Sequence, residues 1–444
     1  MVHIVPFRGL LYNSNRISNV SKVVAPPYDV INPEEQEKLY RRSPHNIVRL
    51  ILNREPNPYE AAAELFKRWQ QEGVLLREEQ RAIYFLRQRF RLRTGEEKER
   101  LGFFALVRLE DPSGGNIHPH ERTLEGPKED RLRLMLACHA NFSAIFALYA
   151  EPKQTINRVL AEYTQGAPPS VTTQDASGAA CQLWSIADAE IISVVQRTMI
   201  NQPLLIADGH HRFEASLKYR EHRSRERSNP SGREAFNFVL MHFANTNDDG
   251  LVILPTHRLV RGFTPIPFRR LEELLQKCFY IEPYPKTRDG QRDFLNALKK
   301  GRRKRGLIGA TFSSDPRYLI LRLKSRRTMQ KLAPEMSASM QDLDVSILHR
   351  LILQHILGLS PEAQVQQGVI RYLEDEEEAL KTVDQERDQA AFVLNPPEPE
   401  QVFAVALQGE RMPQKTTFFY PKLLSGLVIN KIDPDEEFPP DPQA

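Results

Sequence analysis

The stretch Ile192–Ala215, ISVVQRTMINQPLLIADGHHRFEA, contains the local pattern that decides the fold. Ala187–Met199 has the apolar spacing of an amphipathic helix, and Pro203–Ala207 is a short apolar run typical of a buried strand. Asp208 and Gly209 form a turn, after which a second helix is predicted from His210 to about His222. A buried strand between two helices predicts a mixed α/β fold.

The alternation of helices and strands continues outward on both sides. Helices are predicted at Pro33–Arg42 with Asn32 as N-cap, at Tyr59–Glu72 and at Lys128–Ala140. Strands are predicted at Val20–Ala25, Ala82–Arg93, Gly102–Leu109, Ala144–Tyr149, Asn237–Ala244 and Leu251–Pro255, the last two in one sheet with Pro203–Ala207. Residues 151–180 are expected to form a loop or lid. We expect an N-terminal α/β domain over 1–262, a C-terminal α/β domain over 263–432 and a disordered tail over 433–444.

Length and composition describe a folded chain with more than one domain. Of its 444 residues, 41% are hydrophobic and 27% are charged, which excludes a wholly disordered protein. No window approaches the roughly 18 apolar residues of a membrane span, and a cleaved signal peptide is not expected at the N-terminus. Cys138, Cys181 and Cys278 lie too far apart to indicate a disulfide framework or a zinc site. We therefore expect a cytoplasmic protein without a membrane partner.

The chain is weakly basic, and its basic residues are clustered. A formal net charge of +4 is far from the field of an obligate nucleic-acid binder. Basic clusters lie at 220–227 and 299–305, without interleaved aromatic residues for base stacking. Solvated faces are the favoured interpretation of both clusters, and a nucleic-acid contact is the alternative.

The turn after Pro203–Ala207 is the strongest candidate site. A helix N-terminus directs N–H groups and the positive end of its dipole outward, which favours phosphate or carboxylate, and glycine lets the anion approach. We expect a phosphate cradle in which Asp208 also holds Mg²⁺, and its members are Asp208, Gly209, His210, His211 and Arg212. The alternative is an ordinary helix start with Asp208 as N-cap.

A second cluster follows a glycine-rich turn. Pro119 argues against a regular central strand there, so the segment is expected to be an active-site loop. Glu121 is a candidate acid–base catalyst, and the candidate substrate-binding residues are His120, Thr123, Lys128 and Arg131. Zinc binding by His118 and His120 is the weaker alternative, because no third ligand has a diagnostic spacing.

Three further segments carry polar side chains beside predicted strand ends or prolines. Asp29 follows Pro26-Pro27 and is a candidate base, with a rigid corner as the equal alternative. Thr256, His257 and Arg258 suit anion recognition, although a polar strand end explains them as well. Lys415, Thr416 and Thr417 could line a pocket or belong to an irregular packed segment.

Several motifs in their order resemble one prokaryotic family. They are FRGLLY (7–12), VVAPPYDVI (23–31), HERT (120–123), PKEDRL (127–132), ADGHHRFEA (207–215), ILPTHRLV (253–260) and MPQKTTFFYPKLLSGLVI (412–429). The family is catalogued as domain of unknown function 1015, and the resemblance covers about 6–429. It implies no settled activity.

The Ile192–Ala215 block also resembles the ParB/sulfiredoxin superfamily, whose free-serine kinases carry a similar Asp-Gly-His-His-Arg motif. This likeness implies a ParB/sulfiredoxin-like core with a large insertion, and phosphates held by Gly209, His210, His211 and Arg212. It implies ATP or ADP as cofactor, with an early acid as base. Asp29 or Glu34 has that position here, and Glu121 competes for the role.

The leading hypothesis is phosphoryl transfer to a small hydroxylated, serine-like metabolite with nucleotide and Mg²⁺. The catalytic candidates are Asp29, Glu121 and His211. One alternative is a phosphatase for phosphoserine-like compounds. Others are a nucleotide-binding switch or nucleic-acid-associated module, and a scaffold in which His211 and Arg212 are structural.

Overall fold

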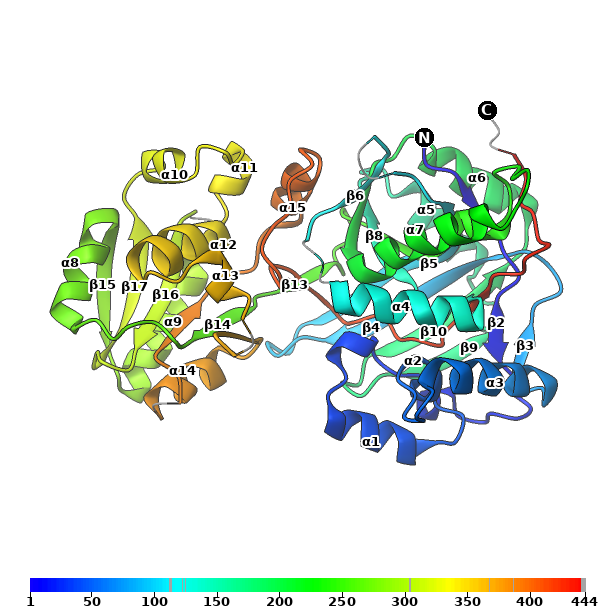
Figure 1. Ribbon diagram of the computed structural model, residues 1–444, viewed down its shortest axis with the longest axis horizontal. Coiled ribbons are helices and arrows are strands. Elements are labelled where there is room, and N and C mark those ends of the chain that lie inside the picture. Colours follow the sequence, from blue (N-terminus) through cyan, green and yellow to red (C-terminus); the bar gives the residue numbers. More distant parts are fainter. Residues whose placement is uncertain are drawn as a thin grey trace. The chain divides into compact units, whose positions relative to one another are not determined.

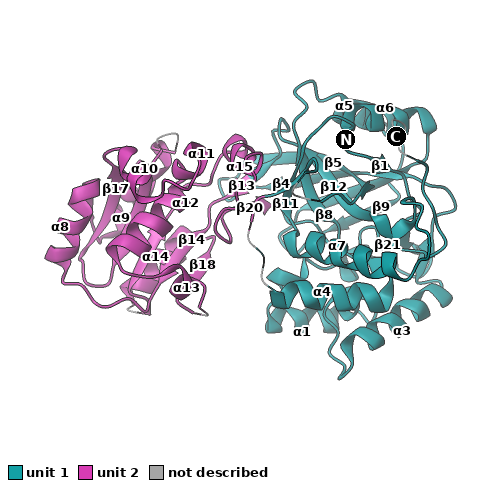
Figure 2. Ribbon diagram, turned by 45° about the horizontal axis from the view of Figure 1, so that its top comes forward, with its two compact units in different colours: residues 1–119, 123–252, 421–444 teal, residues 120–122, 253–420 magenta. Residues whose placement is uncertain are grey.

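The computed structural model describes residues 1–111, 114–121, 123, 125–302, 305–366, 368–385 and 387–440. The mixed α/β class predicted from the sequence is confirmed, and the chain forms two compact units (Figure 2). Unit 1 comprises 1–119, 123–252 and 421–444, and unit 2 comprises 120–122 and 253–420. The ParB/sulfiredoxin-like core stays a prediction.

Unit 1 is built on a nine-stranded mixed sheet in the order β6-β11-β8-β12-β5-β4-β10-β9, with β1 beside β5. Its strands are β1 (Ile4–Val5), β4 (Ile83–Arg91), β5 (Glu97–Arg108), β6 (Ile117–Pro119), β8 (Ile145–Tyr149), β9 (Val171–Gln174), β10 (Ala180–Ile186), β11 (Leu204–Asp208) and β12 (Phe238–Asn245). The long β4 and β5 pair antiparallel, whereas β11 runs parallel to β6 and β12 parallel to β8.

Helices of unit 1 pack on this sheet and around a second core. They are α1 (Pro33–Arg42), α2 (Val48–Ile51), α3 (Pro58–Gln71), α4 (Glu125–Cys138), α5 (Thr155–Tyr163), α6 (Ala189–Met199) and α7 (His210–Arg225). Helices α5 and α6 place Ile156, Leu160, Ile192 and Val195 in the core of the large sheet. Helices α1 to α4 share a second apolar core, and α4 lies alongside both α3 and α7 (Figure 1).

Helix starts follow local chemistry. The Asn32 side chain accepts a hydrogen bond from the Glu35 N–H, and Pro33 occupies the first turn of α1, so this helix has the predicted bounds. The Asp188 side chain likewise accepts from the N–H groups of Glu190 and Ile191 at the start of α6.

The C-terminal segment returns to unit 1, which differs from the expected domain division. Ser425 forms a bridge with Ala25, Ile429 with Leu10, and β21 (Asn430–Lys431) pairs with β7 (Ala140–Asn141). Residues 421–432 therefore belong with the first unit rather than with a C-terminal domain, and unit 2 begins its long stretch at 253 rather than 263.

The expected disordered tail is also wrong over its described part. The Glu436 carboxylate lies 2.6 Å from Arg77 Nη2, 3.2 Å from Arg81 Nη2 and 3.5 Å from Arg8 Nη2, and Phe438 is buried. The proline and acidic residues of this segment are typical of a disordered tail, but its residue Glu436 pairs with arginines that are distant in the sequence and hold the segment in place. Residues 441–444 of that tail lie outside the described residues, as do Arg122 of the HERT motif and Arg303 and Lys304 of the second basic cluster.

Unit 2 contains a six-stranded antiparallel sheet in the order β15-β17-β16-β19-β14-β18. Its strands are β14 (His257–Val260), β15 (Phe279–Pro285), β16 (Leu307–Phe312), β17 (Arg317–Leu323), β18 (Ile370–Leu373) and β19 (Ala390–Val393). Its helices are α8 (Phe268–Cys278), α9 (Arg288–Lys300), α10 (Arg327–Leu332), α11 (Ala338–Gln341), α12 (Asp344–Ile347), the π-helix η4 (Leu348–Ile356), α13 (Pro361–Gln364), α14 (Glu376–Asp384) and α15 (Pro399–Ala406). Phe294 and Leu298 of α9 pack on Leu307, Tyr318 and Val393 of the sheet.

Four local expectations are corrected. Val20–Ala25 is not a strand, because Val20–Lys22 forms a 3₁₀ helix with Asn19 as its cap. The expected lid over 151–180 contains α5 and β9. The segment at His118, expected as a loop, forms β6 at the edge of the large sheet, where Pro119 is tolerated. Strand β13 (Val252–Leu254) pairs with β20 (Phe418–Tyr420) and not within the large sheet.

In the part of the chain that the structure describes, no helix combines the length and the apolar character needed to cross a bilayer.

Candidate functional site

The turn between β11 and α7 has a backbone that requires glycine. The buried strand β11 ends at Asp208, and Gly209 is the N-cap of α7 with φ of +94°, in the left-handed region. A Cβ on Gly209 would also lie 2.9 Å from the Arg212 guanidinium. Glycine therefore allows both the turn and the close approach of Arg212 to the backbone.

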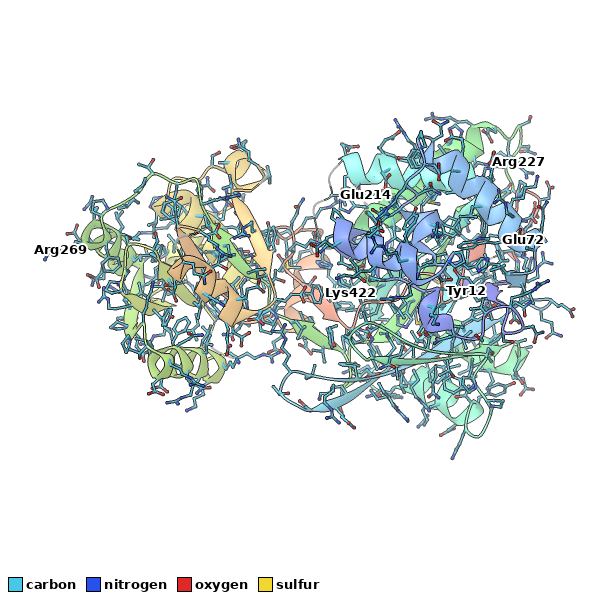
Figure 3. The ribbon with its side chains drawn as sticks, turned by 90° about the horizontal axis from the view of Figure 1, so that it is seen from below. Tyr12, Glu72, Glu214, Arg227, Arg269 and Lys422 are labelled. Carbon is cyan, nitrogen blue, oxygen red and sulfur yellow. The ribbon has the colours of Figure 1, made fainter. Side chains whose placement is uncertain are left out.

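Asp208 is shared by two cations. Its Oδ2 accepts a 2.6 Å hydrogen bond from Arg212 Nη2, and its Oδ1 accepts a 2.6 Å bond from Lys422 Nζ. Arg212 comes from the first turn of α7. Lys422, labelled in Figure 3, comes from the returning C-terminal segment. Two cations thus contact one carboxylate beside the positive N-terminal end of a 16-residue helix.

The expected role of Asp208 as an Mg²⁺ ligand does not fit this arrangement. Both carboxylate oxygens are already bound by cations, and a divalent cation on Asp208 would lie next to both positive charges. Among the described residues, no group of three or more His, Cys, Asp or Glu side chains could hold a metal ion. The arrangement of Asp208 therefore disfavours a metal role for this side chain and does not affect its place beside the helix N-terminus.

Arg212 is fixed from two directions. Its Nη1 donates to the carbonyl oxygen of Ala144, just before β8, and its Nη2 donates to Asp208. Its Nε–H is buried and has no acceptor within the described part of the chain. The guanidinium is thus held in place while its Nε–H has no acceptor among the described residues.

A polar network lies at the start of α7, where Glu214 of this helix contacts Thr123 and Lys128. Glu214 Oε2 accepts a 2.7 Å hydrogen bond from Thr123 Oγ1 and lies 3.1 Å from Lys128 Nζ. Burial lowers the pKa of Lys128, but hydrogen bonds to Glu125 and Glu214 outweigh it, so that the pKa is raised and the side chain stays cationic. Glu214, labelled in Figure 3, was not among the predicted site residues.

A small pocket of about 40 Å³ lies within unit 1, between α4, α7 and the segment after β7. Arg131 and Arg212 supply its cations, and Tyr28, Ser143 and Ser216 supply hydroxyl groups. The Arg131 guanidinium lies 4.1 Å from the centre of the Tyr28 ring, and burial raises the pKa of Tyr28 to about 12. The pocket suits a small polar or anionic group.

Asp29, His210 and His211 belong to the same unit and differ in their burial. Asp29 is exposed and follows Tyr28 in the 3₁₀ helix η2 (Tyr28–Val30). His210 is buried and His211 is half-buried at the first two positions of α7. Together with Thr123, Lys128, Arg131 and the Asp208 turn, they form the unit 1 site.

The other predicted site residues belong to unit 2 and form a separate group: His120, Glu121, Thr256, His257 and Arg258. His120 Nε2 lies 3.1 Å from Thr417 Oγ1, and Glu121 forms a bridge with Met412. His257 Nδ1 accepts from the Leu394 N–H, and burial lowers the pKa of His257. Zinc binding by His118 and His120 stays the weaker alternative, and the described residues contain no group of three or more His, Cys, Asp or Glu side chains that could hold a metal ion.

The first basic cluster is engaged in protein contacts. Arg220 donates to the Leu109 carbonyl, Arg223 pairs with Glu226, and Arg227 donates to the Pro434 carbonyl. In the second cluster, Lys299 pairs with Glu376, Arg302 with Glu398 and Arg305 with Asp342. These described cations therefore have partners in the protein, which favours the interpretation as surface charge.

Lys422 is the functional candidate that sequence reasoning missed. The segment 409–429 was noticed for Lys415, Thr416 and Thr417, which the structure places in unit 2. Lys422 lies 214 positions from Asp208, and no local pattern signals such a contact.

One protein family and several solved structures are similar to this chain. A family model described as protein of unknown function (DUF1015) matches residues 4–346. Among solved structures, the chain is similar to a mutant free serine kinase in complex with ADP, at 12% identity and a TM-score of 0.37, over 76% of this chain and 94% of that chain. It is also similar to a conserved hypothetical protein from Pyrococcus furiosus, at 12% identity and a TM-score of 0.34, over 72% of this chain and 92% of that chain.

A further similar structure is SbnI with C-terminal truncation from Staphylococcus aureus, at 10% identity and a TM-score of 0.34, over 72% of this chain and 85% of that chain. No curated protein matches the sequence.

Proposed function

Since the chain belongs to the DUF1015 family, whose description assigns no activity, we propose its function from the unit 1 site: phosphoryl transfer between a nucleotide and a small hydroxylated, serine-like metabolite. The observation that carries the proposal is the sharing of Asp208 by Arg212 and Lys422 at the start of α7. Two cations therefore meet at one carboxylate beside this helix N-terminus. A phosphate group carries the negative charge that cations and helix N-terminal N–H groups favour.

Phosphoryl transfer suits such a site because it depends mainly on positioning and charge stabilisation. In this proposal, the backbone of Gly209 to Arg212 and the cations of Arg212 and Lys422 hold the nucleotide phosphates. The sequence likeness of the Asp-Gly-His-His-Arg motif to that of free-serine kinases supports the same assignment.

The small pocket next to Arg212 supports a small acceptor substrate. At about 40 Å³ it is much smaller than the roughly 300–1,000 Å³ of drug-sized ligand sites, so it admits only a small group. Arg131 and Arg212 suit a carboxylate, and Asp29 is the acid of unit 1 that we assign as base for the hydroxyl. Glu121, the competing candidate, belongs to unit 2.

Phosphorus NMR of the full-length protein tests the proposal. Matched tubes contain MgCl₂ with ATP and serine, ADP and serine, or phosphoserine alone. We expect new phosphoserine from serine and one of the nucleotides, and at least about a 100-fold lower rate in Arg212→Ala, as for loss of a preorganised charge donor. Free phosphate from phosphoserine alone would select the phosphatase instead.

Arg225→Ala is the matched control, because Arg225 is an exposed arginine on the same helix. It removes the same charge and side chain far from the turn, so its rate should equal that of the wild type. Unchanged spectra in every tube, or equal rates in Arg212→Ala and Arg225→Ala, would remove phosphoryl transfer at this site from consideration.

A further inference from the structure

A second and larger pocket lies wholly within unit 2. Its volume is about 330 Å³, within the usual range of about 300–1,000 Å³ for small-molecule sites. It is formed by β14, the segment after β19, the start of α12 and the residues after α9. Its polar walls include Thr256, Arg258, Arg302, Arg305, Asp344 and Glu398.

Arg258 brings a buried charge to this pocket and has no salt-bridge partner among the described residues. It is 1% exposed, and its guanidinium donates to the backbone carbonyls of Thr256 and Lys415. Its Nε–H is buried without an acceptor among the described residues. The centre of the Tyr372 ring lies 5.5 Å from the guanidinium, and the Glu121 carboxylate contributes a favourable charge without forming a salt bridge with Arg258. A buried charge held mainly by neutral carbonyls is costly, and an anion in direct contact would relieve that cost.

The other charged groups of the pocket leave this positive charge in place. Arg302 and Glu398 pair at 3.1 Å, and Arg305 pairs with Asp342, so these rim charges balance locally. Asp344 accepts a 2.7 Å bond from the Gly306 N–H, and burial raises its pKa to about 7, so about half of it is neutral near that pH. The Thr256 hydroxyl is a further buried polar group without a partner among the described residues.

Part of the remaining wall is apolar and is formed by Leu343, Val345, Leu394, Pro396 and Pro397, next to the polar Asn395, Gln401 and Thr416. A bare inorganic ion would leave this surface uncovered, whereas a ligand with an organic body would cover it. The volume of the pocket, the positive charge of Arg258 and the apolar side chains together favour a small anionic ligand with an organic body.

We propose that unit 2 binds a small organic anion, a phosphomonoester or a carboxylate, with its charged group toward Arg258 and its body against the proline and leucine side chains. Guanidinium groups suit both kinds of anion through paired hydrogen bonds. This inference does not rest on the proposed function, because every lining residue belongs to unit 2.

Isothermal titration of full-length Arg212→Ala tests the proposal with the unit 1 cradle disabled. The probes are AMP for phosphomonoesters, benzoate for carboxylates and inorganic phosphate for the anion without a body. We expect AMP or benzoate to bind one-to-one, and inorganic phosphate at least tenfold more weakly. Failure of AMP and benzoate to bind, or equal affinity for inorganic phosphate, would overturn the proposal.

Variants locate the binding. Arg258→Met in the same background should weaken binding at least tenfold, and Arg302→Gln, a rim change with little risk to folding, should weaken it several-fold. Arg269→Met is the control, because Arg269 is an exposed arginine of α8 outside the pocket (Figure 3). Binding that is insensitive to both pocket variants, or equally sensitive to Arg269→Met, would contradict the assignment. Because the titrations are made in Arg212→Ala and at a pocket of unit 2, failure of the kinase assay leaves this result unaffected.

Discussion

At the residue scale, Gly209 joins backbone conformation to charge. Its φ of +94° is unfavourable for other residues, and a Cβ there would meet the Arg212 guanidinium at 2.9 Å. Gly166 also has positive φ, at +78°, but nothing lies within 4 Å of a Cβ there. Alanine substitutions at these two glycines therefore distinguish the cost of backbone strain from the cost of displacing Arg212.

We expect Gly166→Ala to lower the free energy of unfolding by about 1–2 kcal/mol through strain alone. Gly209→Ala should cost at least about 1 kcal/mol more, because the guanidinium must also move. Urea unfolding followed by tryptophan fluorescence measures both variants. Equal losses would show that the position of Arg212 does not depend on Gly209.

His242 is a buried base that unit 1 holds neutral. It is 1% exposed on β12 between the rings of Phe104 and Phe146, and neither ring nitrogen has a partner among the described residues. A Cβ on Gly102 would lie 2.5 Å from its Nε2, which explains the glycine in β5. Burial, reinforced by the positive charge of Arg100, lowers the pKa of His242 well below 6.5.

This pKa predicts a loss of stability in acid. Below pH 6.5 the unfolded chain takes up a proton at His242 that the folded chain does not, so the free energy of unfolding falls as the pH falls. The slope from this group reaches about 1.4 kcal/mol per pH unit. His242→Leu should lack this contribution, so the two unfolding curves should diverge between pH 7 and pH 5. If the free energies of unfolding of the wild type and His242→Leu change in parallel between pH 7 and pH 5, the low pKa of His242 does not contribute to the loss of stability in acid.

At the element scale, the C-terminal segment contacts and stabilises parts of unit 1 that lie far from it in the sequence. Phe438 lies edge-on to Phe238 at 4.9 Å, with the Arg81 guanidinium 4.8 Å from its ring centre, and Glu436 pairs with three arginines. A chain ending at Ile432 should lose about 3–5 kcal/mol, chiefly from the burial of Phe438.

A chain ending at Phe438 is the matched control, since it keeps these contacts and removes the exposed Pro439 and Pro440. It should unfold at the urea concentration of the wild type within error. Equal stability of the two truncated chains would show that the segment contributes nothing to unit 1.

The elements also show what sequence can predict. Helix α1 has its predicted bounds because Asn32 and Pro33 act within a few residues of the helix start. The C-terminal segment was misjudged because its partners Arg8, Arg77 and Arg81 lie more than 350 positions away in the chain. Lys422 escaped notice for the same reason, whereas the turn from Asp208 to Arg212 was found because its chemistry is local.

At the scale of the whole molecule, the chain changes units in the middle of one predicted site. His120 and Glu121 belong to unit 2, but Thr123, Lys128 and Arg131 belong to unit 1. Nearness in sequence suggested a single active-site loop there. Assignment to a compact unit depends on long-range contacts, which a single sequence does not display.

Both tryptophans of the chain, Trp69 and Trp184, lie in unit 1, so tryptophan fluorescence reports the unfolding of that unit. A nucleotide that binds at the Asp208 turn stabilises the folded unit by mass action, by about 2.7 kcal/mol at 100 times its Kd. We expect saturating ADP or ATP to raise the midpoint of the tryptophan transition in urea. The shift should disappear in Arg212→Ala and Lys422→Ala and persist in Arg225→Ala. If nucleotide leaves the wild-type midpoint unchanged, or if Arg212→Ala keeps the full shift, the Asp208 turn is not the nucleotide site.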